Sequence, residues 1–560
     1  MMRQIIFSLI IIAVASGCKK QPATPALPIT PPVIPAFNNT AARINSVDAG
    51  LLLRNIPVAP VTKFSFSAPV NRSTVNANVS FSDVGGTAIN YSVSYENNDS
   101  TMVIRPSAAL KFLTRYAINV ATGLKSAAGK DLSGFTSVNF NTTIDSSRKF
   151  PLISDDALLD LVQQQTFKYF WDFGHPTSGL ARERSNGDNN IVTSGGSGFG
   201  IMSIITAINR NFVTRAEGLA RMQKISGFLK NTAQTIKGAY PHWLNGTTGA
   251  IIPFSLKDNG ADLVETSFLV QGLLCARQYF NRADATETTL RADINAICDR
   301  VEWDWFNKNN ENVLYWHYST NYTWEMNHKI QGWNECLITY ILAASSTTHS
   351  IPASIYTNGW AGSGSNGFIN GNTYYGYTLP LGSSNGGPLF FSHYSFLGVN
   401  PNGLADAYAN YATQTKNHTL INYSYCVANP NGNYGYSDQC WGLTASDISN
   451  GYTASSPTND VGVIAPTAAL SSFPYAPVES MKALKFFYYT LGDKIFKDYG
   501  FVDAFALKDL WYAPSFLAID QGPIIVMIEN YRSGLLWNLF TSCPEVKAGM
   551  KKLNFTAPYL

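Results

Sequence analysis

The sequence predicts an all-α toroid of the (α/α)6 type, preceded by a small all-β Ig-like sandwich. Between residues 151 and 560 the hydrophobic period is helical, and the segments are of two kinds. Some mix an apolar stripe with a charged face, whereas others, such as LVETSFLVQGLLCA, are apolar nearly all round. This alternation indicates two concentric layers, because helices that are apolar all round must be enclosed on every side. A helical solenoid is the alternative, but the sequence has no repeat of fixed period.

The second observation is a run of short alternating segments between residues 40 and 146, including KFSFSAPV, NYSVSYEN and YAINVAT. Gly, Asn and Asp clusters separate them, which is typical of a β-sandwich of about 100 residues. FSAPVN and YAINVATGLKSAAGK resemble the bacterial Ig-like modules of exported proteins. This region contains no His and only scattered acidic residues, so we expect it to be a spacer, with a weak carbohydrate contact as the alternative.

Residues 1–17 are predicted to be a lipoprotein signal peptide. Arg3 precedes an apolar run over residues 5–16, which is too short to span a bilayer. AVASGC resembles a bacterial lipobox, which implies lipidation of Cys18; a signal anchor is the alternative. Residues 18–39 are Pro-rich and predict an extended linker. We expect an exported outer-membrane lipoprotein, and the lack of acidic residues directly after Cys18 favours the periplasmic side.

The composition argues against a nucleic-acid partner and leaves the presence of one disulfide undecided. The net charge of +3 carries no argument for nucleic acid, and no metal site, cofactor or oligomer is expected. The cysteines after Cys18 show no CxxC spacing. Cys426 and Cys440, which flank a loop, are the only disulfide candidates, and the sequence favours neither outcome.

Carboxylates and glycines precede the apolar helices. TSGGSGFG precedes the first, Asp258, Asp262 and Glu265 open the second, Glu335 opens the third, and Asp520 opens the last. Because the inner helices of a toroid run parallel, these groups are expected to gather around one pit. Such a ring of acids can place a proton donor and a water-activating base on opposite sides of a glycosidic bond.

Inverting cleavage of that bond requires two carboxyl groups about 6.5–9.5 Å apart. Glu335 and Asp520, from different inner helices, fit this requirement better than Asp262 and Glu265, which are neighbours on one turn. Trp333 and Cys336 flank Glu335 with an apolar setting that would raise its pKa and favour the acid role.

Each acid also has a structural interpretation. Asp262 and Glu265 have capping-box spacing, and Asp520 could cap the helix start at Gln521-Gly522-Pro523. Glu529 and Arg532, three residues apart on a buried helix, are expected to form an internal ion pair rather than a catalytic one.

Aromatic and imidazole side chains recur in the Gly- and Asn-rich connections. Clusters of this kind favour a sugar-binding cleft over a purely structural core, because aromatic faces stack on sugar rings and imidazoles bind hydroxyls. The candidates for substrate contact are His242, Trp243, Trp316, Trp324, His328, Trp333, His393 and Tyr394.

Seven motifs lie within residues 154–556: TSGGSGFGIM, DLVETSFLVQGLL, NHKIQGWNE, GGPLFFSHYSFLG, WGLTASD, IAPTAALSSFPYAP and AIDQGPIIVMIENYRSGLLW. With these motifs the region resembles the bacterial glycoamylase-like domain of glycoside hydrolase family 144. The resemblance implies an (α/α)6 fold and an endo-acting β-1,2-glucanase that releases sophoro-oligosaccharides with inversion.

Carried over by motif, the family's pocket acids fall on Asp258, Asp262, Glu265 and Glu335, with Glu335 as general acid. The base is placed on Asp520, and Asp460, in another matching motif, is the alternative. Hydrolysis of a different β- or α-glucan, or glycan binding without catalysis, remains open.

Overall fold

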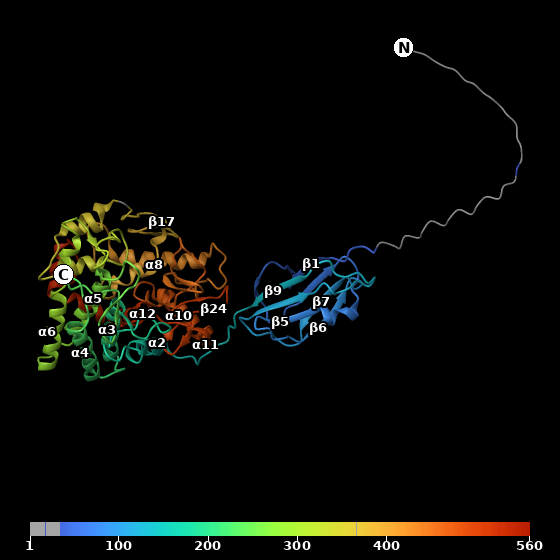
Figure 1. Ribbon diagram of the computed structural model, residues 1–560, viewed down its shortest axis with the longest axis horizontal. Helices are drawn as coiled ribbons and strands as arrows, with labels where there is room; N and C mark the ends of the chain where they lie inside the picture. Colours follow the sequence, from blue (N-terminus) through green and yellow to red (C-terminus); the bar gives the residue numbers. More distant parts are fainter. Residues whose placement is uncertain (1–16, 18–33, 366) are drawn as a thin grey trace, which may run out of the picture. The chain divides into compact units, whose positions relative to one another are not determined.

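The computed structural model describes residues 17, 34–365 and 367–560 (Figure 1). Cys18, the predicted signal peptide except Gly17, and most of the predicted linker lie outside the described residues. Within the described part of the chain, no helix combines the length and the apolar character needed to cross a bilayer.

Residues 39–142 form two sheets, as predicted. One has the strand order β2-β1-β4-β7-β6 and the other β3-β9-β8-β5. In β4, Thr62, Phe64 and Phe66 are buried while Lys63 and Ser65 are half-exposed, so the alternation read from KFSF marks one inward face. The strands are β1 (Asn39–Ile44), β2 (Val47–Asp48), β3 (Leu53–Ile56), β4 (Thr62–Phe66), β5 (Val79–Asp83), β6 (Tyr91–Glu96), β7 (Thr101–Pro106), β8 (Arg115–Val120) and β9 (Thr136–Thr142).

The C-terminal unit is a two-layer helical toroid, which confirms the predicted fold class. Its inner helices are enclosed: every residue of α3 from Ser194 to Ile208 is buried, and so is every residue of α5 from Leu263 to Ala276. The inner layer contains α3 (Ser194–Asn209), α5 (Leu263–Tyr279), α7 (Leu337–Ser345), α9 (Pro466–Leu470) and α12 (Ala518–Ser533). The remaining long helices lie outside them (Figure 1): α2 (Asp155–Trp171), α4 (Arg215–Asn231), α6 (Ala285–Asp299), α8 (Tyr411–Ala428), α10 (Pro477–Lys485), α13 (Leu535–Thr541) and α14 (Pro544–Lys552).

Two glycines let α3 and α5 approach closely. A Cβ added to Gly198 would lie 2.1 Å from the backbone oxygen of Phe268, and one added to Gly272 would lie 2.2 Å from the backbone oxygen of Gly198. Both glycines are therefore required by backbone contact, because any side chain would force the helices apart.

Part of the inner layer is not a long helix. Between α7 and α9, residues 389–397 form the short 3-10 turns η6 (Leu389–Ser392) and η7 (Ser395–Leu397). Their backbone oxygens are hydrogen-bonded by the inner helices: Gln271 of α5 donates to Tyr394 and Asn530 of α12 donates to Leu397, at 3.0 and 2.9 Å. The side-chain amides thus replace the contacts that a regular helix would make.

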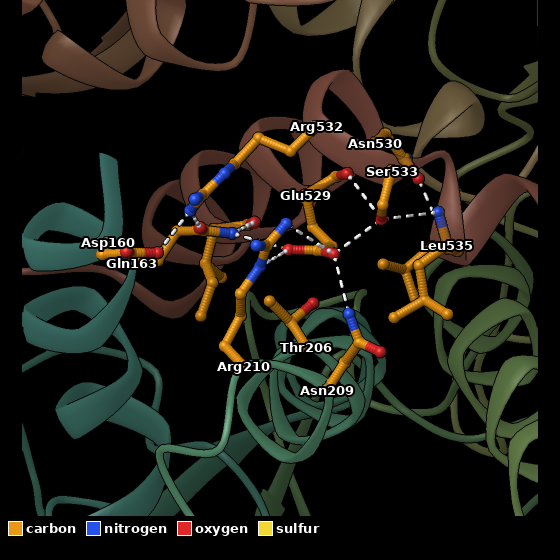
Figure 2. A network of polar contacts seen from close by, with 12 residues as sticks. Asp160, Gln163, Thr206, Asn209, Arg210, Glu529, Asn530, Arg532, Ser533 and Leu535 are labelled. Atoms are coloured by element: carbon orange, nitrogen blue, oxygen red, sulfur yellow. Dashed lines mark hydrogen bonds and ion pairs between the residues drawn. The ribbon is translucent and has the colours of Figure 1, made fainter. Parts of the chain in front are cut away.

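The ion pair expected between Glu529 and Arg532 is absent, because Glu529 pairs with Arg210 at the end of α3 and Arg532 pairs with Asp160 of α2 (Figure 2). Glu529, fully buried in α12, accepts from Arg210 Nε at 2.6 Å. Arg532 donates instead to Asp160 and Gln163 of α2, at 2.5 and 2.8 Å. The network therefore ties α2, α3 and α12 together rather than bridging one turn of α12.

Candidate active site

A cavity of about 600 Å³ lies against the N-terminal ends of inner helices. Several short strands precede these ends: β10 (Ile191–Thr193) leads into α3 and β13 (Ala261–Asp262) leads into α5. The cavity is lined by Glu183, Arg184, Gly187, Asp188, Ile191, Thr193, His242, Trp243, Phe254, Glu265, Phe268, Trp316, Glu335, Phe390, Tyr394, Ala445, Tyr452, Ala454, Leu517 and Ile519. The helix starts converge as the sequence predicted.

Glu335 lies in this wall but not in the first turn of a helix. It occupies the turn before α7, which begins at Leu337. Its side chain is almost enclosed, with the residue 9% exposed, and burial raises its pKa from 4.5 to about 7; the charges of Glu265 and Asp262 add to the shift. A carboxyl group that is half protonated near neutral pH can act as a general acid.

Asp520 is the third residue of α12 and lies behind the wall, where Leu517 and Ile519 line the cavity. It is 1% exposed, and burial followed by the charge of Asp503 raises its pKa well above the usual range of a carboxyl group. Pro523 is the sixth residue of α12, so the helix begins earlier than the Pro-based prediction. Tyr394 interacts electrostatically with both acids: burial and the charges of Asp520 and Glu335 raise the pKa of its hydroxyl group.

Asp262 and Glu265 have different structural roles. Asp262 caps α5 by accepting from the N–H groups of Val264 and Glu265 at 3.0 and 2.9 Å, as the capping interpretation predicted. Glu265 does not close a capping box; its Oε2 accepts from the N–H of Gly195 at 2.8 Å, at the start of α3. The α3 terminus offers N–H groups that have no partner within the helix, and Glu265 binds one of them.

Two histidines approach the acids around Asp262. His242 Nδ1 lies 3.3 Å from Asp262 Oδ2, and His317 Nε2 lies 3.3 Å from Asp258 Oδ2. Burial alone would lower the pKa of His242, but the carboxylates of Glu265, Asp262 and Asp258 outweigh it and raise the pKa to about 9. Protonated imidazole thus offsets part of the negative charge of this cluster.

The same cluster contains a possible set of metal ligands. Within the described ranges, one group of three residues has ligand atoms close enough to hold an ion: His242, Asp258 and Asp262, whose ligand atoms lie within 4.8 Å of one another. Carboxylate and imidazole ligands would suit a borderline or hard divalent cation. A protonated His242 competes for the same carboxylates, which favours hydrogen bonding to hydroxyl groups instead.

Of the predicted contact residues, His242, Trp243, Glu265, Trp316 and Tyr394 line the cavity together with Glu335. Trp324 and His328 do not. Trp324 packs against Trp305 with ring centroids 4.8 Å apart, and His328 stacks on Trp316 at 4.8 Å from outside the cavity lining.

Trp333, His393 and Asp460 are also absent from the cavity wall. Trp333 packs in the core against Phe396 and Tyr411. His393 is 1% exposed and hydrogen-bonded to Ser472 Oγ at 3.0 Å, and burial lowers its pKa to about 3. Both are core side chains, because apolar packing leaves no face open to a ligand.

Asp460 organises a loop. Its two oxygens accept five hydrogen bonds between 2.7 and 3.2 Å, from Tyr425, Asn431, Asn433, Tyr436 and the N–H of Gly462. A carboxylate occupied in this way has no oxygen left to activate water, so the structure does not support Asp460 as the base.

Sequence reasoning missed Glu183, Arg184, Phe254, Phe390 and Tyr452, which all line the cavity. Tyr452 lies on the hairpin of β19 (Ala445–Ile448) and β20 (Gly451–Ala454) and is 49% exposed. The charged pair in ARERSNGD, ahead of the first inner helix, was the available signal for Glu183 and Arg184.

The cysteines Cys426 and Cys440 are both buried and are free thiols in this structure. Burial raises the pKa of Cys426 to about 12, which makes its thiolate rare.

Comparison with known proteins decides the family. Residues 327–544 match the glycoamylase model, described as "Putative glucoamylase", and residues 38–142 match a bacterial Ig-like domain model. A structure from Bacteroides uniformis under the same glucoamylase description is 56% identical, with a TM-score of 0.72, and the match covers 73% of this chain and 100% of that one. This chain belongs to the glycoamylase family.

Two further relatives of this glycoamylase-family chain have named activities. An endo-β-1,2-glucanase from Chitinophaga pinensis, in complex with sophorotriose and glucose, is 52% identical, with a TM-score of 0.71 and coverage of 73% of this chain and 100% of that one. An exo-β-1,2-glucooligosaccharide sophorohydrolase from Parabacteroides distasonis is 46% identical over 427 residues, or 73% of this chain. The match spans 59% of the length of that relative.

Proposed function

We propose that this chain is a glycoside hydrolase that cleaves β-1,2-glucan. The observation that carries the proposal is Glu335, a buried carboxyl group with its pKa raised to about 7, in the wall of a cavity of about 600 Å³. The activities named for the relatives from Chitinophaga pinensis and Parabacteroides distasonis support the choice of linkage.

The proposed reaction inverts the anomeric carbon. Glu335 donates its proton to the leaving glycosidic oxygen while water attacks the anomeric carbon and gives a proton to Asp520. The bond to the leaving oxygen breaks as the bond to water forms, so Glu335 ends ionised and Asp520 ends protonated. The charges of both groups raise the pKa of Tyr394, which lines the cavity together with Glu335.

The cavity wall supplies the binding groups that such a substrate requires. Trp243, Phe254, Trp316 and Tyr452 offer aromatic faces for sugar rings, and His242 with Glu265 offers hydrogen bonds for hydroxyl groups. Phe254 and Tyr452 are 49% exposed each, so their rings are open to a ligand.

We further propose endo cleavage that releases sophoro-oligosaccharides. Cyclic β-1,2-glucan discriminates this from exo cleavage, because a ring has no end from which an exo enzyme can start. The purified chain should open the ring and shorten linear β-1,2-glucan to oligosaccharides, with laminarin, cellulose and starch left intact. Sophorose as the only product, with the cyclic glucan untouched, would contradict the endo assignment, and cleavage of another glucan alone would contradict the linkage.

Glu335→Gln should abolish product formation. Glu217→Gln is the matched control, since Glu217 is exposed and caps α4, where Gln can replace it.

We also propose that the protein is anchored to a membrane by lipid. The lipobox-like sequence ending at Cys18 supports this attachment, and Cys18→Ser should move the protein from the membrane fraction to the soluble fraction.

A further inference from the structure

A β-hairpin outside the cavity has a tyrosine where the geometry of its turn favours another residue. Its strands β17 (Thr373–Tyr374) and β18 (Tyr377–Thr378) are joined by a loop of two residues, Tyr375 and Gly376. Both loop residues have positive φ, 51° for Tyr375 and 87° for Gly376, which is the pattern of a type I′ turn. Asn is preferred at the first position of such a turn, because its short polar side chain tolerates the left-handed conformation.

The left-handed backbone of Tyr375 is unusual in this chain. Most of the described residues with positive φ are glycine or asparagine, and Tyr375 is the only aromatic residue among them. A bulky side chain in this conformation strains the backbone, and such strain is found mainly at functional sites. Packing accounts for only part of it: the ring contacts Tyr425 in a T-shaped arrangement, with centroids 6.5 Å apart, yet Tyr375 is 45% exposed. The strained turn therefore holds an aromatic ring at the protein surface.

The rest of the hairpin offers polar groups without charge. Tyr374 and Tyr377 are paired across the two strands, and both are half-exposed. Thr373 and Thr378 are exposed, and their hydroxyl groups are hydrogen-bonded to each other at 2.9 Å. Hydroxyl groups paired in this way can still accept hydrogen bonds from a ligand. From residue 336 to residue 405 the sequence has no Asp, Glu, Lys or Arg, so the hairpin itself presents no charged side chain.

The hairpin is fixed to the outer helix α8. Asn417 Nδ2 donates to the backbone oxygen of Thr378 at 2.7 Å, and the N–H of Leu381 donates to Gln414 Oε1 at 2.9 Å. The hairpin accordingly lies beside α8 in Figure 1. None of the residues 369–381 lines the cavity. Tyr375 is thus presented from a fixed support that is not part of the proposed active site.

We propose that this hairpin is an accessory binding site for an uncharged glycan chain, and that the ring of Tyr375 stacks on a sugar unit of that chain. The inference rests on the proposed function for the identity of the glycan, β-1,2-glucan. An aromatic face packs against the C–H groups of a sugar ring, while phenol and threonine hydroxyls exchange hydrogen bonds with sugar hydroxyls.

Other classes of ligand fit the hairpin less well. A charged ligand finds no opposite charge on it. A protein partner buries about 800 Å² on each side of a standard interface, whereas the exposed large apolar side chains of the hairpin are Tyr375 and Ile369 alone. A single exposed ring among uncharged hydroxyl groups suits one neutral sugar unit.

The decisive variant is Tyr375→Asn. Asn suits the turn, so the variant should fold at least as well as the wild type, with a thermal midpoint higher by about 1 °C. Loss of the ring should raise KM for long β-1,2-glucan about five- to tenfold with kcat unchanged, because a polymer can engage the hairpin and the cavity at once. KM for a short sophoro-oligosaccharide should not change, because a chain too short to reach both sites gains nothing from the hairpin.

Two further variants control this experiment. Tyr375→Phe keeps the aromatic face and should keep the wild-type KM for long glucan. Tyr531→Gln is the matched control, because Tyr531 is 44% exposed but lies on α12 rather than on the hairpin, and Gln is a good helix former. An unchanged KM for long glucan in Tyr375→Asn, or an equal rise for the short substrate, would overturn the proposal. So would a lower thermal midpoint, since the tyrosine would then be retained for its packing on Tyr425.

A binding measurement without hydrolysis separates this proposal from the proposed function. A native gel containing β-1,2-glucan should retard the Glu335→Gln variant, and adding Tyr375→Asn should weaken the retardation. In a gel containing alginate, a charged polysaccharide, Tyr375→Asn should have no effect, and an effect there would overturn the preference for an uncharged chain. If the retardation by glucan depends on Tyr375 but the wild-type chain hydrolyses no glucan, the function fails and the hairpin site stands. If the wild type is active and Tyr375→Asn changes neither retardation nor KM, the hairpin site fails alone.

Discussion

Glu335→Gln tests the buried acid through stability as well as activity. In the folded protein the pKa of Glu335 is about 7, against 4.5 for an unperturbed glutamic acid. Ionisation in the folded state is thus disfavoured by about 2.5 pH units, or roughly 3 kcal/mol at 1.36 kcal/mol per unit. Because the folded pKa lies above the unfolded one, stability is lost as pH rises from about 4.5 to 7, and the whole penalty is present above pH 7.

Gln is nearly isosteric with protonated Glu and never ionises, so the variant avoids this penalty. We expect wild type and Glu335→Gln to have equal free energies of unfolding near pH 4, and the variant to be more stable by roughly 3 kcal/mol at pH 8. Urea unfolding followed by tryptophan fluorescence at both pH values measures the difference, and product chromatography should show no hydrolysis by the variant. A difference that does not change with pH would refute the buried-acid reasoning, and full activity would refute the role of Glu335.

The remaining predictions concern packing, the loop carboxylate and metal. Glu529→Ala leaves Arg210 without its carboxylate partner and should lower the free energy of unfolding, measured with urea, by about 3–5 kcal/mol. The kcat of this variant should be unchanged, because Glu529 is about 14 Å along α12 from Asp520. Gly272→Ala should lower the thermal midpoint by several degrees, since its Cβ would lie 2.2 Å from the backbone oxygen of Gly198; an unchanged midpoint would show that the helices can separate. Asp460→Asn should reduce stability but keep measurable glucan hydrolysis, and complete loss of activity in a folded variant would restore Asp460 as a candidate base. Dialysis against EDTA should leave the rate unchanged, because His242 already offsets the acids of the candidate metal site; loss of activity restored by a divalent cation would contradict this.

Much of the architecture followed from local pattern. The enclosed helices α3, α5 and α12 were recognisable because residues apolar on every face require burial on every face. Their shared polar end followed from the parallel arrangement of an inner layer, which is why Glu265, Glu335 and the glycines in the first turns of α3 could be assigned to one pit. The N-cap role of Asp262 was also local, since it depends on three consecutive residues.

Other assignments depended on contacts between distant segments. Trp333 and His393 have the same residue types and settings as Trp316 and His242, yet they pack in the core, because aromatic character does not determine which face meets a neighbouring helix. Arg532 pairs with Asp160 rather than with Glu529, its neighbour on α12, because α2 packs against that side of the helix. The residues 389–397 complete the inner layer without a helix because side-chain amides of α5 and α12 satisfy their backbone.

By itself, the sequence determined the two-part organisation, the layered toroid and the acids at one end of it, since periodicity and helix starts are local properties of the chain. Only the tertiary structure decided which carboxyl groups meet. Asp447, Asp503 and Asp520 are separated by 56 and 17 residues, and nothing in their own neighbourhoods marks them as partners. Burial raises the pKa values of Asp503 and Asp520, and burial of this kind exists only once the chain has folded.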